Sequence, residues 1–498
     1  MFSLYKKWIG GSPSSQRTER SHLPSKDSTS SYWHQPPSAF LLHHRTTANL
    51  PEEADVVIIG SGISGTFAAR RLAEEEKLNV VMLEAREACW GATGRNGGHC
   101  QPLIYSSEAR VVRFELQNFD TISTLIKDEQ IDCEWAEPPN GACHAYYSPD
   151  SFAKAKTTVL SLAPDLAPLA SVVEDRAELA ALRIPNAVGA IKQRRAAKLS
   201  PYKLVSWLLE QLLKHGRLNL QTNTAVLSLS ESTTGNGRVR WLVETPRGNV
   251  IAKQVLCATN GYTAHLLPQM EGLIVPVRGE MSALKSTKEI LRRPLECSYS
   301  LFGAIGQDED DYLIQRPVSQ GGELMFGGGR LLAKNEGIDV DNDDGVDEAV
   351  AEYLRSLPAL MDLGDVAAGA AGAAGAAPDD SAAMNMSLEA EAEWTGIMGY
   401  SRDEVPWVGG VPGKEGLFVA AGYTGHGMPN GPLSGRHVAE LIAVAARGGN
   451  WREAEKQAVS AGHIPERYII SPGRMTEALE GPAIIIRSTS AMDNTPPI

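Results

Sequence analysis

Residues 55–65 read DVVIIGSGISG, and this stretch decides the fold. Its first half contains an uninterrupted β-branched run at residues 56–59, which is typical of a parallel strand buried on both faces. Its second half is a GxGxxG pattern, after which a helix is predicted over residues 63–77. In such a pattern the first glycine permits a tight turn, the second lets the backbone approach a pyrophosphate, and the third lets the helix pack closely on the strand. The stretch therefore predicts that an α/β domain begins near Asp55.

A second strand and an acidic residue extend the pattern. Residues 79–83 read NVVML, and Glu84 follows them, 19 residues after Gly65. A carboxylate at this place accepts hydrogen bonds from ribose hydroxyls, while the pyrophosphate lies at the positive N-terminus of the helix. A glycine turn in an unrelated α/β domain is the alternative, and the register of strand, helix and acid disfavours it. We interpret the unit as a dinucleotide-binding site.

Two further glycine-rich segments favour FAD over NAD. GATGRNGGH (residues 91–99) follows Glu84 too soon for another helix and is suited to run along a pyrophosphate, with Arg95 countering phosphate charge and Thr93 donating a hydrogen bond. A glycine-rich surface loop is the alternative there. Near the other end, a predicted strand over residues 417–421 leads into GYTGHGMPNGP and then into a helix. The N-terminus of that helix would stabilise the negative charge that an isoalloxazine gains on reduction.

Composition excludes several classes of protein. The 498 residues include 47 Lys and Arg against 60 Asp and Glu, and the net charge of −13 opposes binding to nucleic acid. The six cysteines form no CxxC pair, unlike a disulfide framework or a zinc module, and we expect no metal site. No apolar run reaches the ~18 residues of a membrane span, and no secretory signal is recognisable. We expect a cytoplasmic protein, with a mitochondrial presequence as the weaker alternative.

Three segments interrupt the alternation of predicted strands and helices. Residues 1–50 predict an irregular extension that Tyr32 and Trp33 attach to the surface. Residues 366–383 contain almost no large apolar side chain and predict a mobile insertion, and the tail from Thr489 is expected to fray. Elsewhere, Ser200 and Pro201 predict a helix start. Hairpins are predicted between residues 238–244 and 249–257 and between residues 312–316 and 323–326.

Together these motifs resemble the FAD-dependent amine and amino-acid oxidoreductases, a family that includes D-amino-acid, glycine and sarcosine oxidases. The likeness is strongest to the branch typified by gamma-glutamylputrescine oxidoreductase and its fungal relatives. It spans Asp55 to Ala446 and is carried by DVVIIGSGISG, MLEAREACWGATGRNGGH, PYKLV, CATNGYT, PVRGE, WTGIMGYSRDEVPWVGG and GLFVAAGYTGHGMPNGP.

The resemblance implies an α/β fold, α+β overall, in which a doubly wound Rossmann-type FAD-binding domain is joined to a second, antiparallel-sheet domain. The second domain would cover the flavin face where the substrate binds. The implied boundaries are residues 51–105, 197–275 and 395–450 for the FAD-binding domain, 106–196 and 276–394 for the substrate domain, and 451–498 for a C-terminal extension.

The resemblance also extends the set of cofactor contacts. Residues 225–227 match the strand whose backbone touches the adenine, and residues 258–261 match the strand end beside the pyrophosphate. From motifs and resemblance together, the residues expected to contact FAD are Gly60, Ser61, Gly62, Ile63, Ser64, Gly65, Glu84, Ala85, Arg86, Gly91, Ala92, Thr93, Arg95, Asn96, Gly97, Gly98, Val226, Ala258, Thr259, Gly261, Gly422, Tyr423, Gly425, His426, Gly427 and Met428.

Two departures from the family pattern concern the chemistry. Sarcosine oxidases bind flavin covalently through a cysteine whose place is taken here by Gly396, so we expect non-covalent FAD. Those oxidases also carry a lysine that promotes reaction with oxygen, on a strand that matches residues 311–316, which contain no lysine. Oxygen or another electron acceptor is therefore left open. Arg316 and His99 are the candidate catalytic residues.

Other candidates have structural alternatives. For His99 and His426, a functional role and an ordinary loop histidine both stay open. Arg278 could hold a substrate carboxylate, but an ion pair with Glu280 or another acid is favoured. Trp394 and Trp407 line the cavity or belong to the core. The acidic runs at residues 308–311 and 341–344 are interpreted as solvated loops, because their spacing does not match an EF-hand.

The function that these observations predict is an FAD-dependent oxidation at the C–N bond of a primary or secondary amine or amino acid. Hydride transfer to flavin N5 would give an imine that water hydrolyses, so no protein nucleophile is required. A same-fold enzyme with a non-amine substrate and, less favoured, a non-catalytic flavin-binding protein are the alternatives. A small-molecule amine and the electron acceptor are the expected partners, and the oligomeric state is left open.

Overall fold

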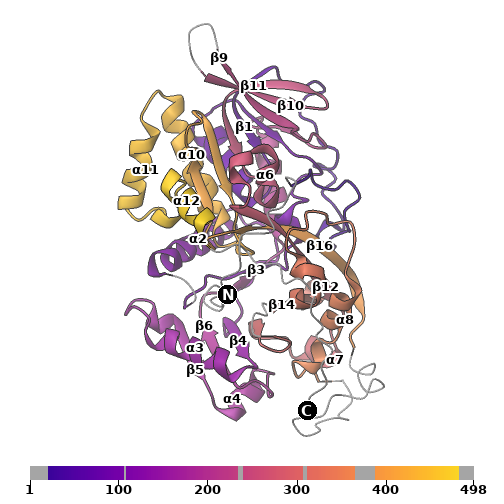
Figure 1. Cartoon of the computed structure of the whole chain (residues 1–498). Helices are drawn as coiled ribbons and strands as arrows, with labels where there is room; N and C mark the ends of the chain where they lie inside the picture. The colour runs from indigo at the N-terminus through magenta and orange to yellow at the C-terminus, as the bar shows by residue number, and fades with distance from the viewer. Residues whose placement is uncertain (1–20, 106–107, 234–238, 307–310, 365–386, 482–498) are drawn as a thin grey trace, which may run out of the picture.

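The computed structural model describes residues 21–105, 108–233, 239–306, 311–364 and 387–481. Two large sheets build two halves of the molecule, which lie one above the other in Figure 1. The predicted insertion at residues 366–383, the tail from Thr489 and residues 1–20 lie outside the described residues.

The first sheet is the expected largely parallel sheet. Its strands are β1 (Glu53–Ile59), β2 (Val80–Leu83), β8 (Asn219–Gln221), β9 (Ser228–Thr233), β10 (Val239–Thr245), β11 (Gly248–Cys257), β17 (Trp407–Gly410) and β18 (Leu417–Ala421). The main strand order is β17-β18-β11-β1-β2-β8, and β10 and β9 extend the sheet from β11. Strands β18, β11, β1, β2 and β8 run parallel, while β17 and the β9–β10–β11 pairs are antiparallel.

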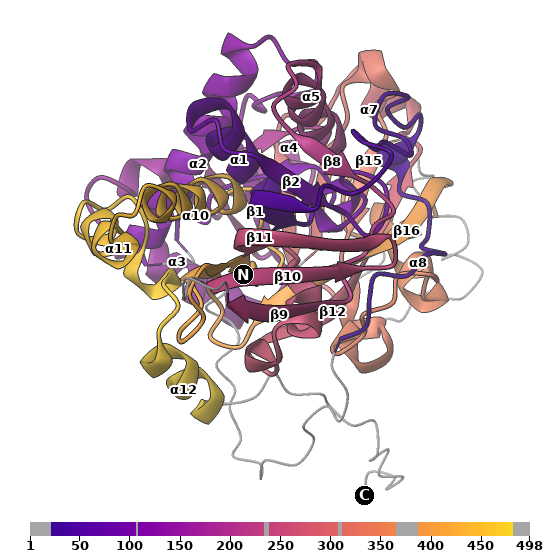
Figure 2. The same ribbon diagram turned by 90° about the horizontal axis from the view of Figure 1, so that it is seen from above.

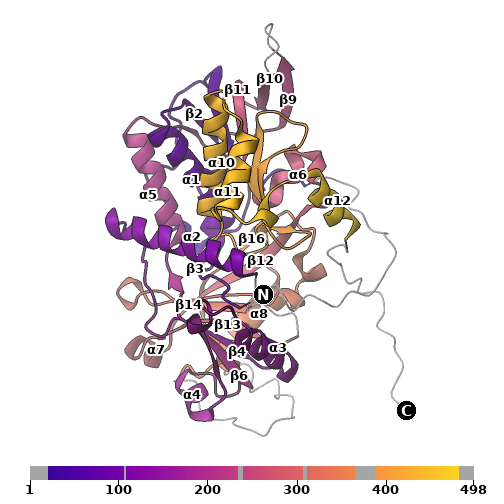
Figure 3. The same ribbon diagram turned by 90° about the vertical axis from the view of Figure 1, so that its left-hand side faces the viewer.

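Helices cover one face of this sheet, as Figures 2 and 3 show. These helices are α1 (Ile63–Arg70), α2 (Ala109–Asp128), α5 (Pro201–Lys214) and α10 (Gly431–Ala446), with α11 (Trp451–Ser460) outside α10. Alternate residues of β1 point to opposite faces, so Val56 and Ile58 pack under the helices while Val57 and Ile59 pack with Trp241 and other residues of the second face. The strand is thus buried on both sides, which explains its continuous apolar sequence.

The second sheet forms the lower half and is almost entirely antiparallel. Its order is β16-β12-β15-β14-β13-β4-β6-β5, and only β13 and β4 run parallel. The strands are β4 (Ala142–Tyr146), β5 (Ala170–Val173), β6 (Gly189–Gln193), β12 (Ile274–Leu284), β13 (Ser298–Phe302), β14 (Asp311–Gln315), β15 (Leu324–Gly327) and β16 (Ala390–Ser401). The helices of this half are α3 (Pro149–Leu160), α4 (Arg176–Ala181), α7 (Lys288–Arg292) and α8 (Glu348–Arg355).

Two long paired strands and one small ribbon connect the halves. β12 pairs antiparallel with β16 along its whole length, and this pair of strands extends from the second sheet toward the first (Figure 1). β3 (His99–Cys100) pairs with β7 (Ala197–Lys198) between the two sheets. The remaining helices are α6 (Thr263–Leu266) and α12 (Pro472–Glu480).

Residues 21–50 are irregular, as predicted, but they are more than a surface attachment. Ser31 caps a short 3-10 turn at Tyr32–His34 by accepting a hydrogen bond from the Trp33 N–H. Trp33 and Leu41 are buried in the core under the helices, with 5% and 1% of their surfaces exposed. Apolar burial of this extent ties the segment to the folded domain.

Most local predictions are confirmed. Ser200 caps α5 by accepting the Lys203 N–H, and both predicted hairpins form, as β10–β11 and β14–β15. One expectation is wrong, because residues 225–227 belong to no strand and instead join β8 to β9. In the described part of the chain, none of the helices combines the length and apolar character that crossing a bilayer requires.

Candidate functional site

A cavity of about 270 Å³ lies where the two halves meet, at the carboxyl ends of β1, β2 and β11. This is where ligands bind in open parallel sheets. The chain turns sharply after β1 because Gly60 has a φ of +101°, and a Cβ there would lie 2.6 Å from the Ala258 carbonyl oxygen. The turn brings the N-terminus of α1 to the cavity.

The start of α1 forms a cradle that suits a pyrophosphate. Gly62 is the N-cap residue and has no side chain to cap the helix, so backbone N–H groups are left for a ligand. The Ile63 N–H donates to Thr93 Oγ1 at 3.1 Å, which fixes the second glycine loop against this turn. A Cβ on Gly62 would lie 3.1 Å from the same hydroxyl oxygen, and one on Gly91 would meet open space. The residues present therefore fit the phosphates of a dinucleotide.

Glu84 is held at the end of β2 by the same turn. One carboxylate oxygen, Oε2, accepts from the Ser61 N–H at 3.0 Å and from the Ser61 hydroxyl at 2.6 Å. The other, Oε1, accepts from the Arg86 N–H at 3.0 Å. Glu84 lines the cavity with only 8% of its surface exposed. Its orientation is thus fixed in the place expected for a ribose partner.

The loop before the second predicted helix also reaches the cavity. The segment between β18 and α10 is anchored by Asn260, whose Oδ1 accepts from the Gly422 N–H at 3.1 Å. Gly425 has a φ of +75°, and residues 425–429 line the cavity. The first turn of α10 is capped from outside, because the Leu433 N–H donates to Asn118 Oδ1 at 2.9 Å and the Gly431 N–H donates to the Gly427 oxygen at 2.7 Å. The loop before α10 therefore faces the cavity opposite the N-terminus of α1.

The structure brings most of the predicted residues together. The predicted residues that line the cavity are Gly60, Ser61, Gly62, Ile63, Ser64, Glu84, Ala85, Arg86, Gly91, Ala92, Thr93, Arg95, Asn96, His99, Val226, Ala258, Thr259, Tyr423, Gly425, His426, Gly427 and Met428. Five predicted glycines, Gly65, Gly97, Gly98, Gly261 and Gly422, are absent from this lining and have packing roles. A Cβ on Gly65, for example, would lie 2.2 Å from the Gly60 oxygen, so this glycine permits helix–strand contact as predicted.

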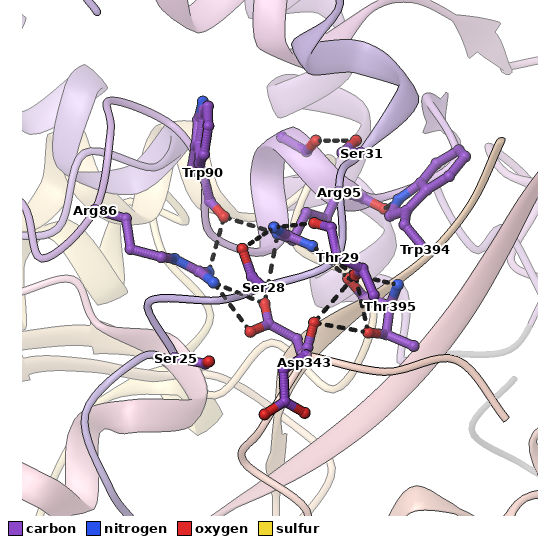
Figure 4. A network of polar contacts seen from close by, with 12 residues as sticks. Ser25, Ser28, Thr29, Ser31, Arg86, Trp90, Arg95, Asp343, Trp394 and Thr395 are labelled. Carbon is purple, nitrogen blue, oxygen red and sulfur yellow. Dashed lines mark hydrogen bonds and ion pairs between the residues drawn. The ribbon is translucent and has the colours of Figure 1, made fainter. Parts of the chain in front are cut away.

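Arg95 lines the cavity, as its loop predicts, and it also holds that loop in place. All five of its N–H groups donate within the protein: Nε to the Trp90 oxygen, and the two terminal nitrogens to Thr395, Thr29 and Ser28 (Figure 4). Burial and the neighbouring Arg86 lower the pKa of Arg95 to about 10. The hydrogen bonds of Arg95 therefore hold the glycine-rich loop of residues 91–99 to residues 28–29 and to β16.

Asp343 corrects the interpretation of the second acidic run as solvated. It is fully buried, and both of its carboxylate oxygens accept from one terminal nitrogen of Arg86, at 3.0 and 2.9 Å. Its backbone oxygen accepts from the Thr29 N–H at 2.8 Å. Asp343 thus joins the glycine loop, the N-terminal segment and the second domain (Figure 4). In the described part of the chain, no group of three or more His, Cys, Asp or Glu residues is arranged to hold a metal.

Arg316, a candidate catalytic residue, is engaged by partners outside the cavity. It donates to both carboxylate oxygens of Glu134, at 3.0 and 2.8 Å, to Glu323 at 2.6 Å and to the Tyr32 hydroxyl at 2.7 Å. It does not line the cavity. Its strand, β14, instead contributes Tyr312, which accepts the Gly97 N–H at 3.0 Å. Arg316 is a structural ion-pair residue.

His99 lies where the sequence predicts, on the wall of the cavity. Its Nε2 is 2.9 Å from Ser298 Oγ, and its ring stacks on Tyr312 with a centroid distance of 6.2 Å. Burial, and then the nearby His426, lower the pKa of His99 to about 3. The ring is therefore neutral at physiological pH and supplies a donor or an acceptor, not a positive charge.

The other weighed residues have structural roles. Arg278 pairs with Glu280 at 3.7 Å, as favoured from the sequence. Trp394 and Trp407 are fully buried in the core and do not line the cavity. His426 lies 3.3 Å from Glu115.

Several cavity residues carry no sequence signal. Leu23 and Pro24 reach the cavity from the N-terminal segment, Gln101 reaches it from the end of β3, and Ser300 and Arg330 reach it from the second half of the molecule. Each of these residues lies outside the recognised motifs, and only tertiary packing brings it to the glycine-rich loops at residues 91–99 and 422–432.

Comparisons with known proteins agree with this geometry. A family model described as FAD dependent oxidoreductase (DAO) matches residues 55–441. The chain is 23% identical over 420 residues to gamma-glutamylputrescine oxidoreductase of Escherichia coli (strain K12), covering 80% of this chain and 85% of that protein. It is 26% identical over 403 residues to a glycine oxidase of Pseudomonas aeruginosa, covering 78% and 94%.

A solved structure shares the fold. The glycine oxidase from Geobacillus kaustophilus superposes with a TM-score of 0.62 at 19% identity, covering 80% of this chain and 96% of that one. The family match spans well over half of the chain and coincides with both helix starts and with the cavity between them. The chain is an enzyme of the DAO family of FAD-dependent oxidoreductases, related to amine and amino-acid oxidases.

Proposed function

We propose that this enzyme oxidises a primary or secondary amine, or an amino acid, at the carbon next to nitrogen. The observation that carries the proposal is that one cavity runs from the FAD-binding turns to a wall built by the second sheet, including Met281, Ser300 and Tyr312. A small molecule against that wall lies beside the cofactor. The two curated relatives named above act, by their names, on an amine and on an amino acid.

FAD supplies the electron-accepting chemistry when bound. The chain's own residues bind and orient the reactants and exclude water. The glycine loops and the N-terminus of α1 would hold the charged parts of FAD. Neutral His99, Tyr312 and Met281 form a largely buried wall, in which a neutral amine is favoured over its ammonium form because burial disfavours charge.

The proposed oxidation requires no nucleophilic side chain, because the cofactor carries the electron-accepting chemistry. The oxidation removes a hydride equivalent from the carbon, which gives an iminium ion; loss of the N–H proton then leaves an imine, which water hydrolyses to a carbonyl compound and an amine or ammonia. A neutral imidazole such as His99 can orient the amine without a change in its own charge. The electron acceptor that completes the cycle is oxygen or another oxidant, and FAD is expected to be bound non-covalently.

The test is anaerobic mixing of the holoenzyme with a panel of primary, secondary and tertiary amines, amino acids and 2-hydroxy acids. We expect the absorbance of oxidised flavin to bleach with a primary or secondary amine or an amino acid. Bleaching by a 2-hydroxy acid and by no amine would contradict the proposal and favour a non-amine substrate. FAD that stays with acid-precipitated protein would contradict non-covalent binding.

A further inference from the structure

Gln101, which belongs to none of the sequence motifs, lines the cavity and has a side-chain oxygen without a hydrogen-bond partner among the described residues. Gln101 follows β3, lines the cavity and has 4% of its surface exposed. Its amide nitrogen contacts His144 Nε2, whereas its amide oxygen, Oε1, is buried and has no hydrogen-bond partner among the residues that the structure describes. A buried acceptor without a partner costs free energy, so such a group in a cavity indicates a ligand that donates to it.

The orientation of this amide follows from the network behind it. Gln193 is fixed by the backbone, because its Oε1 accepts the Ile104 N–H at 3.1 Å and its Nε2 donates to the Pro102 oxygen at 3.2 Å. The same Nε2 lies 3.5 Å from His144 Nε2. An amide donor at this distance makes His144 Nε2 the acceptor nitrogen of the ring.

The other ring nitrogen and two tyrosines are consistent with this tautomer. His144 Nδ1 then carries the proton and donates to the Tyr105 hydroxyl at 2.6 Å, which in turn donates to the Tyr146 hydroxyl at 2.6 Å. All three side chains are buried, and burial lowers the pKa of His144 well below its usual value. The ring is therefore neutral, and its acceptor nitrogen faces Gln101.

Because His144 Nε2 is an acceptor, it determines which end of the Gln101 amide, the NH₂ group or Oε1, is left for a substrate. An acceptor at His144 Nε2 requires the NH₂ group of Gln101, so a flipped amide would place two acceptors against each other. Oε1 is then the atom left for the cavity. Gln101 lines the cavity together with His99, Ser300 and Tyr312.

We infer that Gln101 Oε1 is a specificity-determining acceptor that selects substrates with an N–H group on the reacting nitrogen. The inference rests on the proposed function and narrows it to primary and secondary amines, because a neutral tertiary amine has no N–H to donate. An amine that donates to Oε1 keeps its lone pair for the C=N bond that forms. The N–H also becomes more positive as that bond forms, so the fixed acceptor favours the product side.

The test uses two ligands that carry the same charge and differ in this N–H. At neutral pH, N-methylaniline and N,N-dimethylaniline are both uncharged, and the first carries one N–H while the second carries none. Binding of each to the oxidised holoenzyme is measured from the change in the flavin spectrum. We expect the N–H ligand to bind at least tenfold more tightly to the native enzyme and less than twofold more tightly to Gln101→Met. The steric effect of the added methyl group cancels between the two proteins.

A matched control is available in Gln254. It is a buried glutamine with an unpartnered Oε1 among the described residues, but it lies on β11 outside the cavity. Gln254→Met should retain the full preference for the N–H ligand. Flavin content and melting temperature report whether either variant is misfolded.

Three outcomes would overturn the inference: equal binding of the two ligands by the native enzyme, no binding of either, or an undiminished preference in Gln101→Met. The proposed function fails separately, when no amine of the panel bleaches the flavin.

Discussion

Gly62 is the N-cap residue of α1, where the backbone would approach a pyrophosphate. A side chain there would lie beside Thr93 Oγ1, in the space through which a pyrophosphate meets the N-terminus of α1. We expect Gly62→Val to abolish FAD retention, as measured by the ratio of flavin to protein absorbance after gel filtration. Gly473→Val is the control, because a Cβ at Gly473 meets no atom within 4 Å and the residue lies outside the cavity. A yellow Gly62→Val protein would show that the phosphates bind elsewhere.

Titration of the buried Glu280 carboxyl contributes to the pH dependence of the free energy of unfolding. Burial raises the pKa of its carboxyl from 4.5 to about 7, against the opposing effect of the Asp347 N–H that it accepts. Between these pH values the folded state binds the proton and the unfolded state does not, so stability falls as pH rises through this window. We expect Glu280→Gln to flatten the decline of the melting temperature between about pH 4.5 and 7.

The decline should not vanish completely, because burial also raises the pKa of Glu455 to about 7. Glu455→Gln therefore removes a further part of the slope. An unchanged slope in both variants would contradict these assignments.

The N-terminal segment is the element whose importance the structure changes most. Thr29 binds Asp343 and Thr395, Arg95 binds Ser28 and Thr29, and Leu23 lines the cavity. Asp343 is buried and forms ion pairs with both Arg86 and Arg95 (Figure 4). Removing one partner of such a buried ion pair leaves an uncompensated charge, which is strongly destabilising.

We therefore expect Asp343→Ala to lower the free energy of unfolding by about 3–5 kcal/mol, as measured by denaturant titration. Asp344→Ala is the matched control, because its side chain is exposed and should cost less than about 0.5 kcal/mol. Equal effects of the two substitutions would contradict a structural role for the Asp343 network.

Local signals predict the elements of this fold better than they predict their partners. The run at residues 56–59, the glycines that follow it and the cap at Ser200 have causes within a few residues, and the structure has these elements where the sequence places them. Arg95 is different, because its partners Thr29 and Thr395 lie 66 and 300 residues away. The same holds for Asp343, which looks solvated in sequence and is buried only by tertiary packing. Gln101 has no motif at all.

At the scale of the whole molecule, the charges around the cavity bear on the electron acceptor. Residues 311–316 contain no lysine, Arg316 is held by Glu134 and Glu323 outside the cavity, and His99 is neutral. The first electron transfer to oxygen creates superoxide, which a fixed positive charge stabilises in a buried site.

We expect the reduced enzyme to turn over about tenfold faster with an artificial dye acceptor than with oxygen, which corresponds to about 1.4 kcal/mol of lost stabilisation. The comparison is dye reduction against peroxide release at saturating substrate. Equal rates would contradict it. Arg330→Gln then tests whether Arg330, which lines the cavity, supplies the charge.

The central claim, that this cavity joins FAD to an amine, is tested most directly by the stoichiometry of one anaerobic turnover. Holoenzyme is mixed without oxygen with the amine that bleaches its flavin, and the products are quantified after acid quenching. The account predicts one carbonyl compound and one amine or ammonia for each flavin reduced, and no bleaching by the corresponding alcohol. Flavin reduction that releases no amine or ammonia, or reduction by the alcohol alone, would contradict it.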